Sequence, residues 1–257
     1  MKKICRFIIL VVSVCMLPGT VPAAEQDITV SAAMSLKNAF EDIGRLHYAK
    51  TGVKVIFNFG ASGDLIRQIF AGAPVDVFAS AAPKDMEDLD HKGFVLPATS
   101  VVFARNRLVL IMPLNSKSQV RAFADLDSGT IKRIAICNPN TSPAGRYAGE
   151  VLQYYKVDDR IKDRLIIAEN VRQVLDYVAR GEVDAGIVYL TDAMVRAKEV
   201  RVAATASEAS HKPVVYPIAL VRGSKMESAA RGFISTVLSP EGGRILGQYG
   251  FRTGGNK

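Results

Sequence analysis

Short apolar runs rich in β-branched residues alternate with helical patterns along almost the whole chain, from Ile28 nearly to its end. Runs of this kind are typical of buried strands, and their alternation with amphipathic helices predicts an α/β fold with largely parallel strands. Nine predicted strands suggest two small sheets. They cover residues 28–31, 53–59, 75–80, 108–112, 134–137, 165–168, 185–189, 200–203 and 214–221.

Amphipathic helices are predicted between these strands. Apolar residues fall on one helical face in the segments 36–46, 148–155, 171–178 and 233–238. Gly52, Gly72 and Gly181 stand just past predicted helix ends, where a left-handed closing residue is commonly needed. Ser239 followed by Pro240 predicts the start of one more helix.

The N-terminal residues 1–24 have the pattern of a secretory signal peptide. Basic residues precede the apolar run 7–17, which is shorter than the roughly 20 residues needed to span a bilayer. Small residues follow, and cleavage is expected after Ala23 or Ala24. Cys15 suggests a lipoprotein, but Val14 stands where lipid attachment requires a small residue. A cleaved signal peptide and a periplasmic protein are therefore expected.

Loss of the signal peptide changes both the cysteine count and the charge. Cys137 becomes the single cysteine, which excludes an intramolecular disulfide and predicts a buried apolar residue. The remaining chain has 30 basic and 25 acidic residues, a net charge of +5, because three basic residues leave with the leader. The basic residues are scattered and form no run, so nucleic-acid binding is not expected.

Four predicted strand-to-helix junctions offer small or capping residues and free backbone donors. They lie at residues 33–36, 60–63, 138–145 and 169–171. The first N–H groups of a helix have no partner within it, and the aligned peptide dipoles make that end positive. Such junctions lie along the carboxyl edge of a sheet, where these folds bind ligands. Two junctions from each half of the molecule can therefore converge on one small anion.

Five residues are the predicted donors to this anion. Ser35 and Ser62 supply hydroxyl groups, Ala144 and Val171 supply backbone N–H groups, and Tyr189, at the end of the strand 185–189, supplies a phenol.

Each residue also has a purely structural interpretation. Ser35, Ser62 and Asn170 can be ordinary helix caps. Pro143 can simply start a helix, and Tyr189 can be a core ring with its hydroxyl at the surface. The prediction of an anion site therefore depends on the whole set.

Six segments resemble the periplasmic molybdate-binding proteins of ABC importers, in order along the chain. They are SAAMSL at 31–36, FGASG at 59–63, GAPVDVF at 72–78, PAGRYA at 143–148, ENVR at 169–172 and DAGIVY at 184–189. Many solute-binding proteins end like residues 239–241 and 249–251, which is less specific. Asn138 departs from the family pattern, which often has aspartate there, and this departure concerns the shape of the loop rather than the donors.

The resemblance implies a fold, a ligand and a partner. The fold is the type II periplasmic-binding-protein fold, with two α/β domains whose mixed, largely parallel sheets are joined by a two-strand hinge. Crossings near 105–107 and 213–216 divide the chain into a discontinuous domain, 25–105 plus 216–257, and an inserted domain, 106–215. In the family, two serines, backbone N–H groups and a tyrosine hydroxyl hold the oxyanion, which implies Ser35, Ser62, Ala144, Val171 and Tyr189. It further implies a monomer that delivers molybdate or tungstate to an ABC permease, with no cofactor and no cation-coordinating metal site.

The chemistry of the ligand agrees with this donor set. Molybdate carries no proton at neutral pH, so its oxygens only accept hydrogen bonds, whereas a site for phosphate gains from an acceptor carboxylate. Asp64 and Glu169 are expected outside the ligand shell, next to helix N-termini. Discrimination against the smaller sulfate ion is expected to depend on cavity size.

Three alternative functions remain open at this stage. The first is binding of another tetrahedral oxyanion such as sulfate, and the second is an anion sensor that docks on a receptor. The third is a secreted serine hydrolase using Ser35 or Ser62. The segment 60–63 lacks the G-x-S-x-G spacing, and His47, His91 and His211 are expected to be packing or surface residues. No metal-ligand spacing, P-loop or dinucleotide motif occurs in the sequence.

Overall fold

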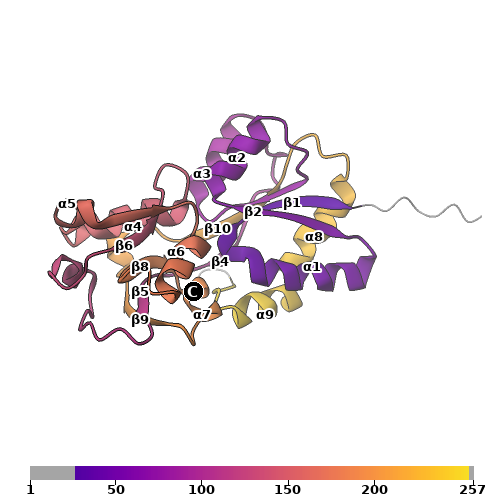
Figure 1. Cartoon of the computed structure of the whole chain (residues 1–257). Helices are drawn as coiled ribbons and strands as arrows, with labels where there is room; N and C mark the ends of the chain where they lie inside the picture. The colour runs from indigo at the N-terminus through magenta and orange to yellow at the C-terminus, as the bar shows by residue number, and fades with distance from the viewer. Residues whose placement is uncertain (1–26, 255–257) are drawn as a thin grey trace, which may run out of the picture.

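The computed structural model describes residues 27–254, and in that range ten strands form two five-stranded sheets. The predicted signal peptide lies outside the described residues. Figure 1 shows two lobes: the indigo N-terminal part and the yellow C-terminal part form one, and the magenta to orange middle of the chain forms the other. We call the first of these lobe I and the second lobe II.

The sheet of lobe I has the strand order β2-β1-β3-β10-β4. Its strands are β1 Ile28–Ala33, β2 Val55–Gly60, β3 Val77–Ala79, β4 Val101–Arg105 and β10 Val215–Leu220. Strand β1 is parallel to β2 and β3, whereas β10 runs antiparallel between β3 and β4. Helices α2 (Ser62–Phe70) and α3 (Pro83–His91) cover one face, and α1 (Lys37–Thr51), α8 (Glu227–Leu238) and α9 (Pro240–Gln248) lie on the other side (Figure 1). The short helix η1 (Met34–Leu36) joins the end of β1 to α1.

The sheet of lobe II repeats this pattern, with the order β7-β6-β8-β5-β9. Its strands are β5 Leu108–Pro113, β6 Ile134–Cys137, β7 Leu165–Ala168, β8 Ala185–Tyr189 and β9 Val200–Thr205. Strand β6 is parallel to β7 and β8, whereas β5 is antiparallel to β8 and β9. The helices of lobe II are η2 Phe123–Asp127, α4 Pro143–Tyr154, α5 Asp158–Ile161, η3 Lys162–Arg164, α6 Val171–Ala179, α7 Leu190–Val195 and η4 Glu208–Ser210.

The observed strands correct the prediction in two respects. All nine predicted strands are present, but the count of nine is wrong because β4 forms a tenth. This edge strand is short and is followed directly by polar residues, so its local sequence does not distinguish it from a loop. Pairing with β10 makes it a strand. The eight strand pairs are evenly divided between parallel and antiparallel, because β10 and β5 each run against two neighbours.

The predicted helix ends are confirmed by backbone geometry. Gly52, Gly72 and Gly181 have φ of 74°, 89° and 68°, the left-handed conformation that glycine adopts without steric cost. Ser239 caps α9, because its hydroxyl accepts a hydrogen bond from the Gly242 amide at 3.1 Å.

The chain passes between the two sheets twice. The first crossing joins β4 to β5 between Arg105 and Leu108, and the second joins β9 to β10 between Thr205 and Val215. The backbone N–H group of Asn106 donates to the Val214 carbonyl at 3.0 Å, so the crossings lie side by side. We call this region the hinge. At these two crossings the chain passes from one sheet to the other. The exact domain boundaries, at 105/106 and 215/216, stay a prediction.

Buried apolar side chains lie on both faces of each sheet. One cluster, which includes Leu65, Phe78 and Leu89, packs α2 and α3 onto lobe I, and the larger cluster fills the rest of both lobes. Cys137 is buried as predicted. No helix within residues 27–254 is long and apolar enough to cross a membrane.

Candidate functional site

Strand register places the four predicted junctions in two adjacent pairs. In lobe I, Ala33 at the end of β1 pairs with Gly60 at the end of β2. In lobe II, Cys137 at the end of β6 pairs with Ala168 at the end of β7. Because parallel strands that end level also release their helices at the same edge, each sheet presents two helix starts side by side.

Ser35 lies inside η1, directly after β1, and is 5% exposed. Its hydroxyl makes no helix cap, and it lies 3.0 Å from the hydroxyl of Tyr216 on β10. Plain capping, the structural interpretation of this serine, is therefore wrong.

Ser62 is the first residue of α2 and is fully buried. Its hydroxyl oxygen accepts a hydrogen bond from the Ala81 amide at 3.2 Å, so it does not cap its own helix. The neighbouring Gly63 amide donates to the Thr141 carbonyl of lobe II at 2.9 Å. The start of α2 therefore contacts the opposite lobe directly.

Ala144 has the first backbone N–H group of α4, because Pro143 occupies the first helical position and has no amide proton. Ser142 precedes the helix but makes no side-chain cap. The helix start is therefore not satisfied by its own N-cap side chain.

Val171 begins α6, and the predicted cap at Asn170 is confirmed. The Asn170 side chain accepts hydrogen bonds from the Arg172 amide at 3.0 Å and the Gln173 amide at 3.2 Å. This cap satisfies the second and third amides of the helix and leaves the Val171 amide outside it.

Tyr189 ends β8 and is 1% exposed. Its hydroxyl oxygen is buried and has no hydrogen-bond partner among the described residues. A core ring with its hydroxyl at the surface is therefore the wrong interpretation. Burial raises the pKa of Tyr189 well above its ordinary value, so the phenol keeps its proton and can donate it.

A small cavity lies where these groups meet. It measures about 10 Å³ and is lined by residues of both lobes: Ala33, Met34, Ser35, Gly60, Ala61, Ser62, Ala81, Ser142, Pro143, Asn170, Val171 and Tyr189. Four of the five predicted donors line it, and Ala144 follows directly after two lining residues. No lining residue is charged. The structure therefore brings four of the predicted donors together at one cavity, with Ala144 next to its lining.

The size of this cavity is a constraint on binding. Its volume is about the minimum that holds one water molecule. A tetrahedral oxyanion is larger, so the lining loops have to separate to admit it. Because the lining comes from both lobes, a change in the separation of the lobes changes the space available.

An outer cleft of about 380 Å³ adjoins the cavity and shares Gly60, Ala61 and Asn170 with it. Asp64 and Glu169 line this cleft and do not line the cavity. Asn138 also lines the cleft, and its side-chain oxygen accepts a hydrogen bond from the Asn140 amide at 3.0 Å. Asparagine thus supplies an acceptor that holds the loop, as an aspartate would.

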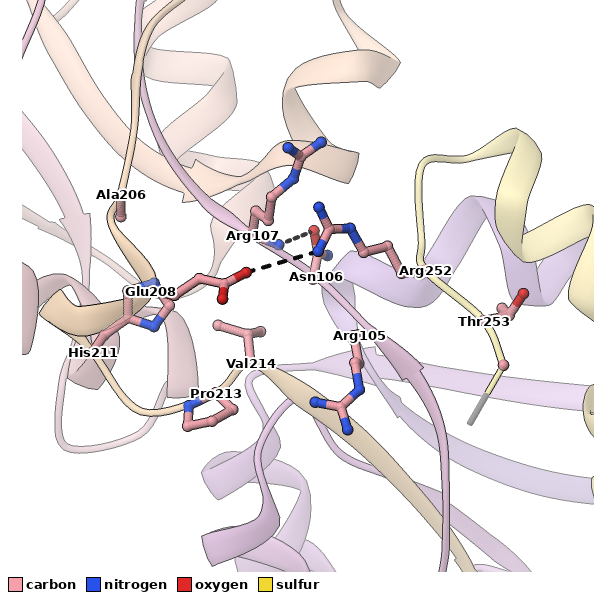
Figure 2. A pocket seen from close by; sticks show the side chains of 11 residues that line it. Arg105, Asn106, Arg107, Ala206, Glu208, His211, Pro213, Val214, Arg252 and Thr253 are labelled. Atoms are coloured by element: carbon pink, nitrogen blue, oxygen red, sulfur yellow. Dashed lines mark hydrogen bonds and ion pairs between the residues drawn. The ribbon is translucent and has the colours of Figure 1, made fainter. Parts of the chain in front are cut away.

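A larger hollow of about 680 Å³ lies at the hinge (Figure 2), and none of the five predicted donors lines it. Arg105, Arg107 and Arg252 give it a basic lining, and the Arg252 guanidinium lies 3.8 Å from the exposed carboxylate of Glu208. No buried polar atom without a partner is found among its described lining residues, whereas the small cavity has Tyr189. The small cavity is therefore the better candidate, despite its lower volume.

The three histidines and the acidic residues show no arrangement for catalysis or metal binding among the described residues. His47 is 1% exposed and its Nδ1 lies 2.9 Å from Thr236 Oγ1, while burial lowers its pKa. His91 is exposed and His211 is half-buried. Neither Ser35 nor Ser62 has a hydrogen bond to a histidine within residues 27–254. In the same range, no three His, Cys, Asp or Glu side chains gather as a metal site.

Tyr216 and Asn106 are site-supporting residues that the sequence did not reveal. Tyr216 was predicted only as part of the strand 214–221 and of a crossing, yet its ring packs against Tyr189 with centroids 5.9 Å apart. Asn106 donates to the Tyr216 hydroxyl at 3.2 Å. Both come close to the cavity through pairing of distant strands, which no local pattern indicates.

Comparison with known proteins gives consistent matches over most of the chain. The family model of the bacterial extracellular solute-binding proteins matches residues 28–252. Molybdate-binding protein ModA of Escherichia coli is 39% identical over 240 residues, which cover 91% of each chain. A putative ABC transporter substrate-binding lipoprotein of Bacillus subtilis, YvgL, is 37% identical over 226 residues, covering 87% of this chain and 85% of that protein. The solved periplasmic molybdate-binding protein of Azotobacter vinelandii superposes with a TM-score of 0.80 at 26% identity, covering 89% of this chain and all of the other.

Proposed function

The chain belongs to the bacterial extracellular solute-binding proteins, and on this premise we propose that it captures molybdate or tungstate and delivers it to an ABC importer. Relatives named for molybdate binding match over nine tenths of the chain, which supports this ligand. The type II periplasmic-binding-protein fold, with two five-stranded mixed sheets, provides two lobes around one cavity.

The observation that carries this proposal is an uncharged set of donors from both lobes. Ser35, Ser62 and Tyr189 have hydroxyl groups at the cavity, and α4 and α6 start beside it. Hydrogen bonds and helix dipoles can stabilise an anion without a cationic side chain. The buried Tyr189 hydroxyl supports the assignment most directly, because it has no partner in the described part of the chain and an oxyanion would supply one.

The same donor set supports a dianion that carries no proton. No carboxylate lines the cavity, so a ligand proton would find no charged acceptor there. Hydrogen phosphate carries such a proton, whereas molybdate, tungstate and sulfate do not. We propose that discrimination against sulfate depends on how tightly the closed loops surround the smaller ion.

The location and partners follow from the same proposal. A cleaved signal peptide would place the mature protein in the periplasm, where it would act as a monomer and dock on an inner-membrane permease. We propose that it binds its ligand without a cofactor and without changing it chemically. The lack of any hydrogen bond from a described histidine to Ser35 or Ser62 supports binding over hydrolysis.

The test is calorimetry on the purified protein, residues 25–257, with molybdate, tungstate, sulfate and phosphate. Tight binding of one molybdate or tungstate ion is expected, and Ser35→Ala should weaken it by roughly 1.5 to 3 kcal/mol. Binding of sulfate or phosphate with no heat from molybdate or tungstate would assign the protein to another oxyanion.

Two further measurements separate the alternative functions. A serine-directed phosphonate should not label Ser35 or Ser62, and labelling would favour a hydrolase. Association with a permease from membrane extracts is expected of a transport protein. Molybdate-dependent association with a signalling receptor instead would indicate a sensor.

A further inference from the structure

A chain of hydrogen bonds runs from the hinge to Ser35. It starts at Asn106, which lies in the first crossing and is 9% exposed. The Arg107 amide donates to Asn106 Oδ1 at 2.9 Å, as Figure 2 shows. This contact fixes the orientation of the side-chain amide, because its oxygen has to face the Arg107 N–H group.

The Nδ2 group of Asn106 therefore faces the opposite way and donates twice. One hydrogen bond goes to Thr191 Oγ1 in lobe II at 2.9 Å, and the other goes to the Tyr216 hydroxyl in lobe I at 3.2 Å. Asn106 thus contacts both lobes, and the Tyr216 oxygen is an acceptor in this contact.

The direction of the next hydrogen bond follows from the surroundings of Tyr216. This side chain is completely buried, and burial raises its pKa well above the ordinary value, so its hydroxyl keeps a proton. Among the described residues, Ser35 Oγ, at 3.0 Å, is the one acceptor found for that proton, because Asn106 offers only N–H groups. If Ser35 donated instead, a buried Tyr216 proton would be left without an acceptor, which is unfavourable.

Ser35 is therefore the acceptor from Tyr216, and its own proton is left to point into the cavity. Ser62 has the same hydrogen-bond polarity, by which we mean that its oxygen accepts from the protein and its proton is left for a ligand. Its oxygen accepts from the Ala81 amide at 3.2 Å. Each serine receives one hydrogen bond from the protein and presents its O–H group to a ligand.

We propose that Asn106 and Tyr216 are positioning residues that fix Ser35 as a hydrogen-bond donor, and that this fixed polarity selects oxyanions without a proton over those that carry one. The inference rests on the proposed function, because it takes Ser35 as a ligand contact. Neither positioning residue lines the cavity, so both act through Ser35.

The first test variant is Tyr216→Phe, which removes the donor to Ser35 and leaves its hydroxyl free to accept a proton. Calorimetry with molybdate and with phosphate should be compared at pH 6 and pH 8. Molybdate affinity is expected to fall about tenfold, and the ratio of molybdate to phosphate affinity should fall by at least as much. The largest change in this ratio is expected at pH 6, where more of the phosphate carries an additional proton.

Asn106→Asp is the second variant and guards against a folding defect in the first. A carboxylate at this position would accept the Tyr216 proton and release Ser35, so the same fall in the affinity ratio is expected. Tyr147→Phe is the matched control. Tyr147 is also a buried tyrosine, its hydroxyl lies 3.4 Å from the Pro213 carbonyl oxygen, and it does not line the cavity, so the ratio should stay unchanged.

The outcomes separate this inference from the proposed function. A wild-type protein that binds no molybdate would overturn both. A wild-type protein that binds molybdate and depends on Ser35, but whose affinity ratio is unaffected by Asn106→Asp and by a folded Tyr216→Phe, would overturn the positioning role alone. An equal loss of affinity for both anions would show a merely structural role and would also overturn it.

Discussion

Asp85 of lobe I and Arg146 of lobe II form an ion pair between the lobes, with Arg146 Nη2 2.7 Å from Asp85 Oδ2. The carboxylate is almost fully buried, with 4% of its side chain exposed, and it also accepts a hydrogen bond from Ser80 at 3.3 Å. Burial raises the pKa of Asp85, and Arg146 opposes that shift. The contact therefore stabilises the charged carboxylate only while the lobes lie close together.

Replacing Arg146 tests this contact. Arg146→Gln leaves a buried carboxylate without its cation, a change that typically costs about 3–5 kcal/mol. Urea unfolding should show the loss, and molybdate affinity should fall because closure of the lobes is less favourable. The double variant Asp85→Asn/Arg146→Gln should recover part of the stability. A double variant less stable than Arg146→Gln would contradict this explanation.

Gly63 should be indispensable for close approach of the lobes. A Cβ atom at this position would lie 2.7 Å from the Thr141 carbonyl oxygen, a backbone atom of the opposite lobe. Gly63→Ala is expected to reduce molybdate affinity at least about tenfold, with little effect on unfolding because alanine favours the helix. Gly149→Ala on α4 is the control, since nothing lies within 4 Å of its Cβ position. Equal affinity of both variants would show that the lobes need not approach this closely.

Tyr189→Phe should separate binding from stability. The hydroxyl has no partner among the described residues, so its removal is expected to leave the free energy of unfolding unchanged or to raise it. Molybdate affinity should fall by roughly 1.5 to 3 kcal/mol, the usual value of a hydrogen bond to a charged group. Thermal unfolding and calorimetry measure the two effects. A variant with wild-type affinity would remove Tyr189 from the ligand set.

Asp192 should give the protein a measurable pH dependence of stability. This carboxylate is fully buried, and burial raises its pKa from 3.8 to about 6, although Arg172, 3.5 Å away, opposes the shift. The folded state binds the proton more tightly than the unfolded chain, so the free energy of unfolding falls as pH rises between these values.

The variant Asp192→Asn keeps the shape of this side chain and removes its titration. Relative to the wild type, it should gain roughly 2 to 2.5 kcal/mol between pH 4 and pH 7.5, which is most of a shift of about two pKa units at about 1.4 kcal/mol each. Urea unfolding at both pH values measures this gain. A difference from the wild type that stays constant across the range would show that Asp192 does not titrate there.

The sequence was sufficient for the local structure of the candidate site. The apolar runs that end at Cys137 and Tyr189 are predicted correctly, because buried strands of a doubly wound sheet are almost continuously apolar. The run that ends at Ala168 is also a strand, although it lies at the sheet edge with Ile166 and Ile167 exposed. The cap at Asn170 and the helix start at Pro143 were also predictable, since both depend on residues within one turn. Motif resemblance then selected the five donors, whose role as ligands stays a prediction.

Strand pairing and contacts between distant residues could not be predicted from local sequence patterns. Strand β4 is defined by its pairing with β10, and the antiparallel directions of β10 and β5 follow from where the chain re-enters each sheet. The hydrogen bonds of Ser35 to Tyr216 and of Arg146 to Asp85 join residues 181 and 61 positions apart. No spacing along the chain indicates such partners.

The sequence by itself determined which groups this protein can offer to an anion, because backbone propensity and helix starts are properties of a few neighbouring residues. Only the tertiary structure decided how those groups are directed. The roles of donor and acceptor at Ser35 and Ser62 depend on Tyr216 and Ala81, which packing brings to them from other strands and loops. A hydroxyl can donate or accept equally well, and its three-dimensional neighbours determine which it does.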